Sequence, residues 1–390
     1  MNRAPRAVRP HIGILGRVNV GKSTLMNALT GQAAALVSEE PGTTTDPVFR
    51  SMEMLPFGPV VIVDTGGLED PTELGRARSA ATGRVLRRLD LGLVVVEEEE
   101  LHPVEEEIIG RLEEMEVPWI LVHNYRGDNP NPEDDRVAVD ALRGEGVEYL
   151  KEKVAHYLDV SFIEPPLVGD LLSGDAPVLL VAPIDGAAPK GRLILPQVQT
   201  MRDILDAGYA ATICRETELE ETLGSMGQLP QLVITDSQVF GLVAGIIPES
   251  VPLTSFSILM ARYKGDLGEL VSGIEAVRNL EEGDKVLIVE GCTHHRQDDD
   301  IGTVKIPRIL RQMVGGELEF TWRAGQADPG ELHGFDLIIH CGGCMLGRRD
   351  MVSRVGIARE AGVPMVNYGV FLAHASGILD RSLEPLLSAI

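Results

Sequence analysis

The sequence predicts an α/β protein, and three observations support this prediction. Apolar runs of roughly four to six residues, the length of buried strands, recur along the chain, and stretches with helical spacing separate them. A glycine-rich loop follows the first of these runs, and cysteine-containing loops follow two of the last. Because parallel strands place their carboxyl ends at one edge of a sheet, loops at those ends commonly bind ligands.

The first strand, expected at residues 11–15, leads into the loop Gly-Arg-Val-Asn-Val-Gly-Lys-Ser at residues 16–23, and residues 24–29 continue as a helix. A strand, a glycine loop and a helix in this order form a phosphate-binding P-loop, in which backbone N–H groups and the helix N-terminus face the phosphates. Lys22 would reach the β- and γ-phosphates, and the Ser23 hydroxyl would bind Mg²⁺. The other residues of this segment expected to contact the nucleotide are Gly16, Asn19, Gly21 and Thr24.

Two segments downstream complete the phosphate side of the site. Residues 41–46 read Pro-Gly-Thr-Thr-Thr-Asp, a polar loop in which Thr44 would order over the γ-phosphate and contact Mg²⁺. The next strand ends at Asp64, which would hold Mg²⁺ through water, and the backbone of Gly66 or Gly67 would sense the γ-phosphate. We expect slow turnover, because no arginine finger or catalytic glutamine is evident near these glycines. The residues expected to carry catalysis are Lys22, Thr44, Asp64 and Gly67.

Together these motifs resemble the small-GTPase superfamily, so the resemblance implies an N-terminal Ras-like P-loop GTPase domain that binds GTP. They are most similar to the tRNA-modification GTPases, which have an asparagine in the P-loop and a Gly-Thr-Thr first switch. In that branch the P-loop asparagine helps to hold a potassium ion, and Asn19 matches it in position. The same residue type is also an ordinary turn former, so both interpretations of Asn19 stay open.

The base-reading segment departs from the pattern of that superfamily. Asn124 follows the expected strand at residues 119–123, but the usual Asn-Lys-x-Asp here reads Asn-Tyr-Arg-Gly-Asp. The lysine is lost, and the aspartate, Asp128, comes one place late; the next motif, usually Ser-Ala, reads Asp140-Ala141. Because guanine specificity in the superfamily rests on that aspartate, we expect weaker selectivity for GTP than usual.

The prolines Pro165 and Pro166 mark a domain boundary, because they end the preceding helical stretch. We predict three α/β domains at residues 1–165, 166–267 and 268–390. The middle domain shows no phosphate loop and no cluster of ligands, so we interpret it as a dimerisation module that makes the protein a homodimer. Within it, the pairs Asp236-Ser237 and Thr254-Ser255 each end a strand. Either pair could be functional, but helix capping is the favoured prediction. Cys214 is predicted to lie in the core.

Two short loops of the last domain combine cysteine with histidine. A predicted helix over 267–280 leads to a strand at 286–289, and another strand is expected at 335–339. The loops that follow these strands contain Cys292 and His294 in the first, and His340, Cys341 and Cys344 in the second. Thiolates and imidazoles that meet at neighbouring strand ends would form a soft-metal site, for zinc or for an iron–sulfur cluster.

The ligand types alone fit a structural zinc ion and an iron–sulfur cluster equally well. The cysteines could also be small buried apolar residues, but a Cys-x-x-Cys pair beside histidine is less typical of that role. A helix follows Cys344, and its N-terminus is expected to favour the thiolate form.

The composition excludes several function classes. The chain has 35 basic and 59 acidic residues, and its net charge of −24 argues against a broad nucleic-acid surface or adsorption to anionic lipid. No apolar run approaches the ~18 residues of a membrane-spanning helix, and no signal peptide is visible, so we expect a cytoplasmic protein without membrane partners.

The combined pattern resembles the [FeFe]-hydrogenase maturation GTPases, the HydF family. A P-loop domain joined to Cys-x-His and His-Cys-x-x-Cys, with 45 residues between the two histidines, is a specific combination. Further segments that read like that family are residues 188–196, 234–238, 253–257, 299–302 and 366–369. The match runs over nearly the whole chain.

This resemblance implies a [4Fe–4S] cluster held by Cys292, Cys341 and Cys344. It also implies a scaffold that receives a diiron precursor, made with two radical-SAM maturases, and delivers it to apo-hydrogenase. A four-iron cube needs a fourth ligand, for which His294, His340, a carboxylate or water are the candidates.

Two other functions remain compatible with the sequence. One is a GTP-dependent RNA-modification factor with a structural zinc site, which the acidic net charge disfavours. The other is a zinc-stabilised interaction protein with a nucleotide domain that does not hydrolyse GTP, which the altered base-reading segment allows.

Overall fold

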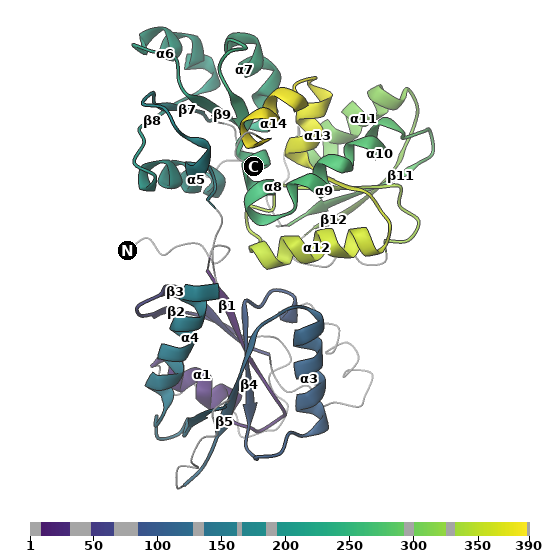
Figure 1. Ribbon diagram of the computed structural model, residues 1–390. Helices are drawn as coiled ribbons and strands as arrows, with labels where there is room; N and C mark the ends of the chain where they lie inside the picture. The colour runs from purple at the N-terminus through teal and green to yellow at the C-terminus, as the bar shows by residue number, and fades with distance from the viewer. Residues whose placement is uncertain are drawn as a thin grey trace. The chain divides into compact units, whose positions relative to one another are not determined.

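A computed structural model describes residues 9–31, 48–65, 85–127, 136–161, 166–184, 193–291, 300–324 and 332–387. The chain divides into two compact units, residues 1–163 and 164–390, so the division falls beside the paired prolines (Figure 1). Thr44, Gly66, Gly67, Asp128, Cys292 and His294 lie outside the described residues.

The described residues of the first unit form a six-stranded sheet in the order β2-β3-β1-β4-β5-β6. Of these strands β2 pairs antiparallel with β3, and the other pairings are parallel. The strands are β1 His11–Leu15, β2 Val48–Met54, β3 Gly58–Asp64, β4 Leu91–Val96, β5 Trp119–Asn124 and β6 Arg136–Val139. The sequence reading missed β2 and β6 because these edge strands are largely half-exposed and lack a continuous apolar run.

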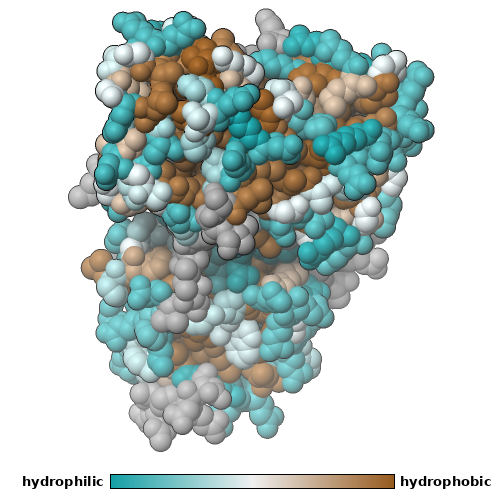
Figure 2. All heavy atoms as spheres, turned by 45° about the horizontal axis from the view of Figure 1, so that its top comes forward, coloured by the Kyte–Doolittle hydropathy of each residue, from teal (hydrophilic) through white to brown (hydrophobic). Residues whose placement is uncertain are grey.

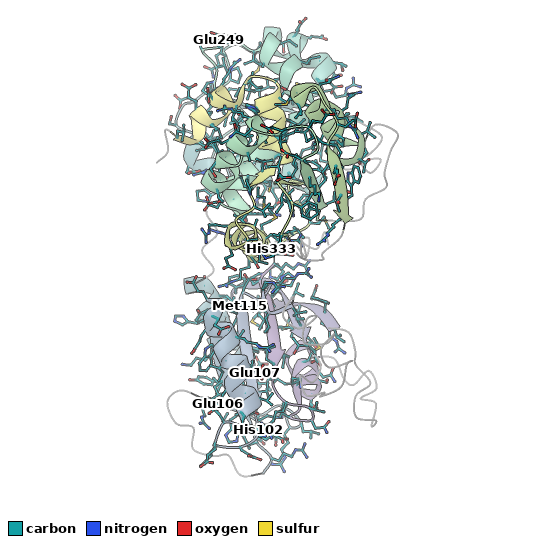
Figure 3. The ribbon with its side chains drawn as sticks, turned by 90° about the vertical axis from the view of Figure 1, so that its right-hand side faces the viewer. His102, Glu106, Glu107, Met115, Glu249 and His333 are labelled. Atoms are coloured by element: carbon teal, nitrogen blue, oxygen red, sulfur yellow. The ribbon has the colours of Figure 1, made fainter. Side chains whose placement is uncertain are left out.

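Helices cover both faces of this sheet (Figure 1). They are α1 Lys22–Thr30 and α4 Val147–Ser161 on one face, and α3 Pro103–Glu114 on the other. Alternation along the strands creates two cores, because Ile12 and Ile14 pack with α1 and α4, whereas Val61 and Val63 pack with α3. The N-terminus of α3 is closed by a capping box between His102 and Glu105; His102 and Met115 mark the two ends of this helix in Figure 3.

The described residues of the second unit form two parallel four-stranded sheets. Their orders are β10-β9-β7-β8 and β12-β11-β13-β14. The first contains β7 Val178–Val181, β8 Ala211–Cys214, β9 Leu232–Thr235 and β10 Leu253–Ser255. The second contains β11 Lys285–Glu290, β12 Glu319–Ala324, β13 Leu337–His340 and β14 Met365–Asn367. The predicted α/β fold is confirmed in both units.

The α-helices of the second unit lie between these strands in the chain. Those before β11 are α5 Leu195–Asp206, α6 Leu219–Ser225, α7 Phe240–Ile246, α8 Phe256–Lys264, α9 Leu267–Ser272 and α10 Ile274–Arg278. Those after β11 are α11 Ile306–Val314, α12 Arg348–Glu360, α13 Tyr368–Ala375 and α14 Leu379–Leu387. The described residues of this unit also contain four short helical turns, which are η2 Gly169–Leu171, η3 Glu216–Glu218, η4 Ser237–Val239 and η5 Ile301–Lys305.

The helix predicted over residues 267–280 is two helices that meet at Gly273. A Cβ atom at Gly273 would lie 2.3 Å from the Met365 carbonyl oxygen, so this junction packs directly on β14. The predicted caps are confirmed, since Asp236 accepts from Gln238 N and Ser255 accepts from Ile258 N. Cys214 is buried in the core, as predicted, and its burial raises the pKa of the thiol.

One hydrophobic core runs through both sheets of the second unit. It joins Val233 of β9 and Leu259 of α8 to Ile288 of β11 and Phe371 of α13. Arg381 of α14 adds polar contacts across the same boundary. Its guanidinium donates to the carbonyl oxygens of Ala244, Ile247, Pro248 and Val251. The two sheets are therefore parts of one folded body.

No helix among the described residues is both long and apolar enough to cross a bilayer.

Candidate functional site

The P-loop after β1 has the backbone conformation that phosphate binding requires. Gly16, Asn19 and Gly21 have φ angles of 139°, 69° and 88°, a region that favours glycine and tolerates asparagine. A side chain at Gly16 would place its Cβ atom 2.5 Å from the Val95 carbonyl oxygen. The glycine spacing is therefore set by backbone conformation and by close packing on β4.

Lys22 is buried and is held above the loop by two carbonyl groups. Its ammonium donates to the Gly16 oxygen at 2.9 Å and to the Arg17 oxygen at 2.5 Å. A positive charge fixed at the start of α1 favours phosphate at the same place as the helix dipole does. The position predicted from the motif is thus occupied by a preorganised cation.

Ser23 and Asp64 meet at the ends of neighbouring elements. The Ser23 hydroxyl donates to the Asp64 carboxylate at 2.7 Å, and Asp64 is 4% exposed at the end of β3. A hydroxyl and a carboxylate side by side next to a phosphate loop are the oxygen groups that Mg²⁺ prefers. Nearby, Thr24 is half-buried on α1 and Asn19 is exposed. The nucleotide role of Thr24 and the potassium role of Asn19 stay predictions.

Asn124 connects the P-loop to the segment after β6. Its amide group donates to the Val20 carbonyl at 2.8 Å and its oxygen accepts from Ala141 N at 3.2 Å. A Cβ atom at Gly21 would lie only 2.2 Å from the Asn124 Nδ2 atom. The buried asparagine therefore supports the loop that would carry the phosphates.

The residue in the usual lysine position points toward the turn after β6. Tyr125 is 7% exposed, and its hydroxyl donates to Glu145 at 3.4 Å. Burial, and then Glu145, raise the pKa of Tyr125. In the same turn Asp140 accepts from the backbone N–H groups of Leu142 and Arg143. Within the described residues, Tyr125 is thus bonded to the turn that follows β6.

Sequence reasoning missed a charged contact from the P-loop to α3. Arg17 donates to the Glu105 carboxylate at 2.9 Å, and Glu105 is fully buried while its other oxygen accepts from His102 N. The capping box of α3 thereby fixes one flank of the P-loop. The sequence shows the capping box as a glutamate three places after His102, but this spacing does not identify Arg17 as the partner of Glu105.

The second candidate site lies at the carboxyl edge of the β12-β11-β13-β14 sheet. The connection from β11 leads outward to β12 and that from β13 leads to β14, so the chain reverses direction between β11 and β13. Ligands in open α/β sheets bind at such a switch point. Cys341 follows β13 there, and its N–H donates to the Val289 carbonyl of β11 at 2.9 Å.

Two backbone groups approach the sulfur of Cys341. Gly291 N donates to Sγ at 3.1 Å, and a second bond comes from Gly343. Burial nevertheless raises the pKa of Cys341 to about 11, and Cys344 and Glu290 act in the same direction. The thiolate form expected from the following helix is therefore not favoured at Cys341, because α12 begins only at Arg348 and burial dominates.

His340 lies beneath this loop. It is fully buried, with Nδ1 2.7 Å from the Cys341 carbonyl oxygen and Nε2 3.5 Å from a guanidinium nitrogen of Arg354. Burial, and then Arg354, lower its pKa to about 4. Both ring nitrogens face protein groups, which argues against His340 as the fourth ligand of a cluster.

The described part of the donor set fits a thiolate-bound metal. Cys341 and Cys344 lie on one loop, and N–H donation to sulfur, as Cys341 receives it here, is a usual feature of iron–sulfur sites. Within the described residues no three His, Cys, Asp or Glu side chains converge on one point. The predicted ligands Cys292 and His294 lie outside these residues, so the full ligand set stays a prediction.

Three parts of the chain match known families. Residues 11–125 match the 50S ribosome-binding GTPase family. Residues 167–265 match the hydrogenase maturase F dimerization domain, and residues 268–385 match the hydrogenase maturase F tetramerization domain. The chain belongs to the hydrogenase maturase F, or HydF, family. The predicted resemblance is thereby confirmed, and the first unit of this HydF-family chain is a GTPase domain.

Curated relatives match the GTPase domain. GTPase Der from Novosphingobium aromaticivorans is 34% identical over 166 residues, which are 42% of this chain and 36% of Der. GTPase Era from a Thermoanaerobacter species is 31% identical over 163 residues, 38% of this chain and 54% of Era. The tRNA modification GTPase MnmE from Hamiltonella defensa is 34% identical over 38% of this chain and 35% of MnmE. This HydF-family chain thus spans about a third to a half of these relatives.

Two solved structures also match part of this chain. Era from Aquifex aeolicus bound to GDP and aluminium fluoride covers 53% of this chain and 91% of that chain, with 19% identity and a TM-score of 0.34. NFeoB from S. thermophilus, bound to the same ligands, covers 42% of this chain and 69% of that chain, with 21% identity and a TM-score of 0.31.

The glycines at the two ends of α1 offer a matched test of the P-loop. Gly21→Ala places a Cβ atom 2.2 Å from Asn124, so we expect at least a ~10-fold loss of affinity for a fluorescent GDP analogue. Gly31→Ala has a similar positive φ but no atom within 4 Å, so we expect a loss of ~1–2 kcal/mol in stability and nearly unchanged affinity. Equal affinities of the two variants would contradict the role assigned to the Gly21–Asn124 contact.

Proposed function

We propose that this HydF-family chain is a GTP-hydrolysing scaffold for [FeFe]-hydrogenase maturation. In this proposal it binds GTP and Mg²⁺ in the first unit and a [4Fe–4S] cluster in the second, accepts a diiron precursor and transfers it to apo-hydrogenase. The observation that carries the proposal is that one chain joins a P-loop GTPase domain to two hydrogenase maturase F domains. The second of these domains has Cys341 and Cys344 at the switch point of its sheet, on residues 341–347, which we call the thiol loop.

The nucleotide part of the proposal rests on the residues arranged around the expected phosphate position. Lys22 binds the β- and γ-phosphates, and Ser23 and Asp64 hold Mg²⁺. Thr44 and Gly67 close over the γ-phosphate, and Asn124 and Asp128 are the residues left to contact the base. Turnover is slow because this chain offers no evident arginine finger or catalytic glutamine beside Gly67.

The cluster part rests on the thiol loop. Cys292, Cys341 and Cys344 would hold the cluster, and backbone N–H groups at residues 291 and 343 donate to the Cys341 sulfur. A fourth ligand would come from His294, a carboxylate or water. When bound, the cluster supplies an iron that can exchange its ligand. The diiron precursor is the cargo.

The family domains support self-association, and we propose a homodimer formed through residues 167–265. This region exposes apolar side chains, among them Leu205 on α5, Ile213 on the edge strand β8 and Leu242 on α7. Figure 2 shows apolar patches on the visible face of the second unit. The other proposed partners are two radical-SAM maturases and the apo-hydrogenase. The site of action in this proposal is the cytoplasm.

The metal content of the anaerobically iron-reconstituted protein tests this function. We expect a brown protein with broad absorbance in the blue and about four irons per chain. Cys341→Ser should lose most of this iron and should fail to activate hydrogenase, because one thiolate is missing. Cys214→Ser is the matched control, since that thiol is buried in the other sheet, and it should keep its iron. A colourless wild-type protein that carries zinc would overturn the cluster proposal.

The phosphate side is tested by GTP hydrolysis. Lys22→Ala and Asp64→Ala should each reduce turnover to background, because one loses the phosphate cation and the other the Mg²⁺ contact. Lys153→Ala, an exposed change on α4, should leave it unchanged. Wild-type turnover in both active-site variants would refute the assignment.

Nucleotide choice is tested by competition between ATP and GTP for the site. We expect a preference for GTP below ~1000-fold, or about 4 kcal/mol, because the usual lysine is Tyr125 and the aspartate is displaced. A larger preference would show that Asp128 or another group restores the contact to guanine.

A further inference from the structure

Lys264 is a buried lysine that is not part of the sequence motif of either proposed site. It is the last residue of α8 and is 2% exposed. Its ammonium donates to three carbonyl oxygens of the thiol loop, those of Gly343 at 3.3 Å, Cys344 at 3.1 Å and Leu346 at 2.9 Å. A buried ammonium needs such partners, because removing it from water without hydrogen bonds is costly.

These bonds connect two parts of the second unit. Lys264 lies in the region that matches the dimerization domain, whereas the loop lies in the region that matches the tetramerization domain. Three carbonyl groups from one short segment converge on a single atom. The conformation of residues 343–346 is therefore tied to the position of α8.

The direction of the peptide groups follows from the same contacts. In a trans peptide the N–H of a residue points opposite to the carbonyl of the residue before it. Because the Gly343 and Cys344 carbonyls face Lys264, the N–H groups of Cys344 and Met345 point away from it. Gly343, with φ of 61°, provides the turn, and its own N–H donates to the Cys341 sulfur. Of the N–H groups in this segment, that of Gly343 is thus aimed at a sulfur, and a donor at a sulfur favours negative charge there.

We propose that Lys264 is a positioning residue that fixes the thiol loop through three carbonyl groups and places a positive charge against that loop. The part of this proposal that concerns the bound cluster rests on the proposed function. The part that concerns the loop holds for the metal-free protein as well. The negative charge of a metal–thiolate centre is stabilised by a nearby cation, so removal of that cation lowers the reduction potential of the centre.

The first measurement is amide hydrogen exchange of the metal-free, full-length protein. Lys264→Met keeps the length of the side chain but removes its donors, so residues 341–347 should exchange about tenfold faster while β11 and β13 stay protected. Lys285→Met, an exposed change at the start of β11, is the control and should leave this exchange unchanged. If residues 341–347 exchange at the wild-type rate in Lys264→Met, the proposal is overturned.

The second measurement is the midpoint potential of the reconstituted cluster. Lys264→Met should shift it to a lower value, and Lys264→Arg, which keeps the charge, should restore much of it. An unchanged potential in Lys264→Met would overturn the electrostatic part of the proposal. If Lys264→Met does not fold, Lys264→Gln serves both measurements, because it stays polar and still removes the charge. If the wild-type protein binds no cluster, the proposed function is refuted. The role of Lys264 in fixing the loop is still tested in that case, because the exchange measurement does not depend on iron.

Discussion

Both candidate sites depend on one constraint, that parallel strands end together at the point where the chain reverses its direction across a sheet. In the first unit β1 lies between β3 and β4; the P-loop follows β1, and Asp64 is the last residue of β3 at the same edge. In the second unit β13 pairs with β11, and the thiol loop follows it. Strand pairing brings residues such as Asp64 and Ser23 together although 41 positions separate them. Loops can then vary in chemistry while the sheets hold them in place.

The second constraint is the shared core of the C-terminal unit. Because Leu259 and Ile288 lie in the same core, movement of the dimerization region relative to the region that carries the thiol loop would expose apolar surface. Arg381 and Lys264 cross the same boundary with buried or partly buried hydrogen bonds. Self-association through residues 167–265 would therefore act on the thiol loop through rigid contacts and needs no flexible linker between these two regions.

The sequence predicts the parts of this structure that depend on local patterns. The strand at residues 11–15 is predicted at its observed bounds, because it is a short apolar run that leads directly into a glycine loop. The edge strand β2 and the break at Gly273 were not predicted, since both depend on packing against distant residues. The same limit applies to the sites. The P-loop follows from its spacing, whereas the contacts of Lys264 and Glu105 join positions 79 to 88 residues apart, which no local pattern records.

The retained Asn124 is weak evidence for guanine recognition in this chain. Its amide nitrogen donates to Val20 and its oxygen accepts from Ala141, so the side chain holds the P-loop against the turn after β6. Loss of those bonds would leave buried polar groups unpaired, at a cost of about 1–3 kcal/mol each. This structural requirement is independent of the base. The phosphate site alone is therefore enough to require Asn124, whatever residue occupies the usual lysine position. Here that residue is Tyr125, whose hydroxyl donates to Glu145 in the turn after β6.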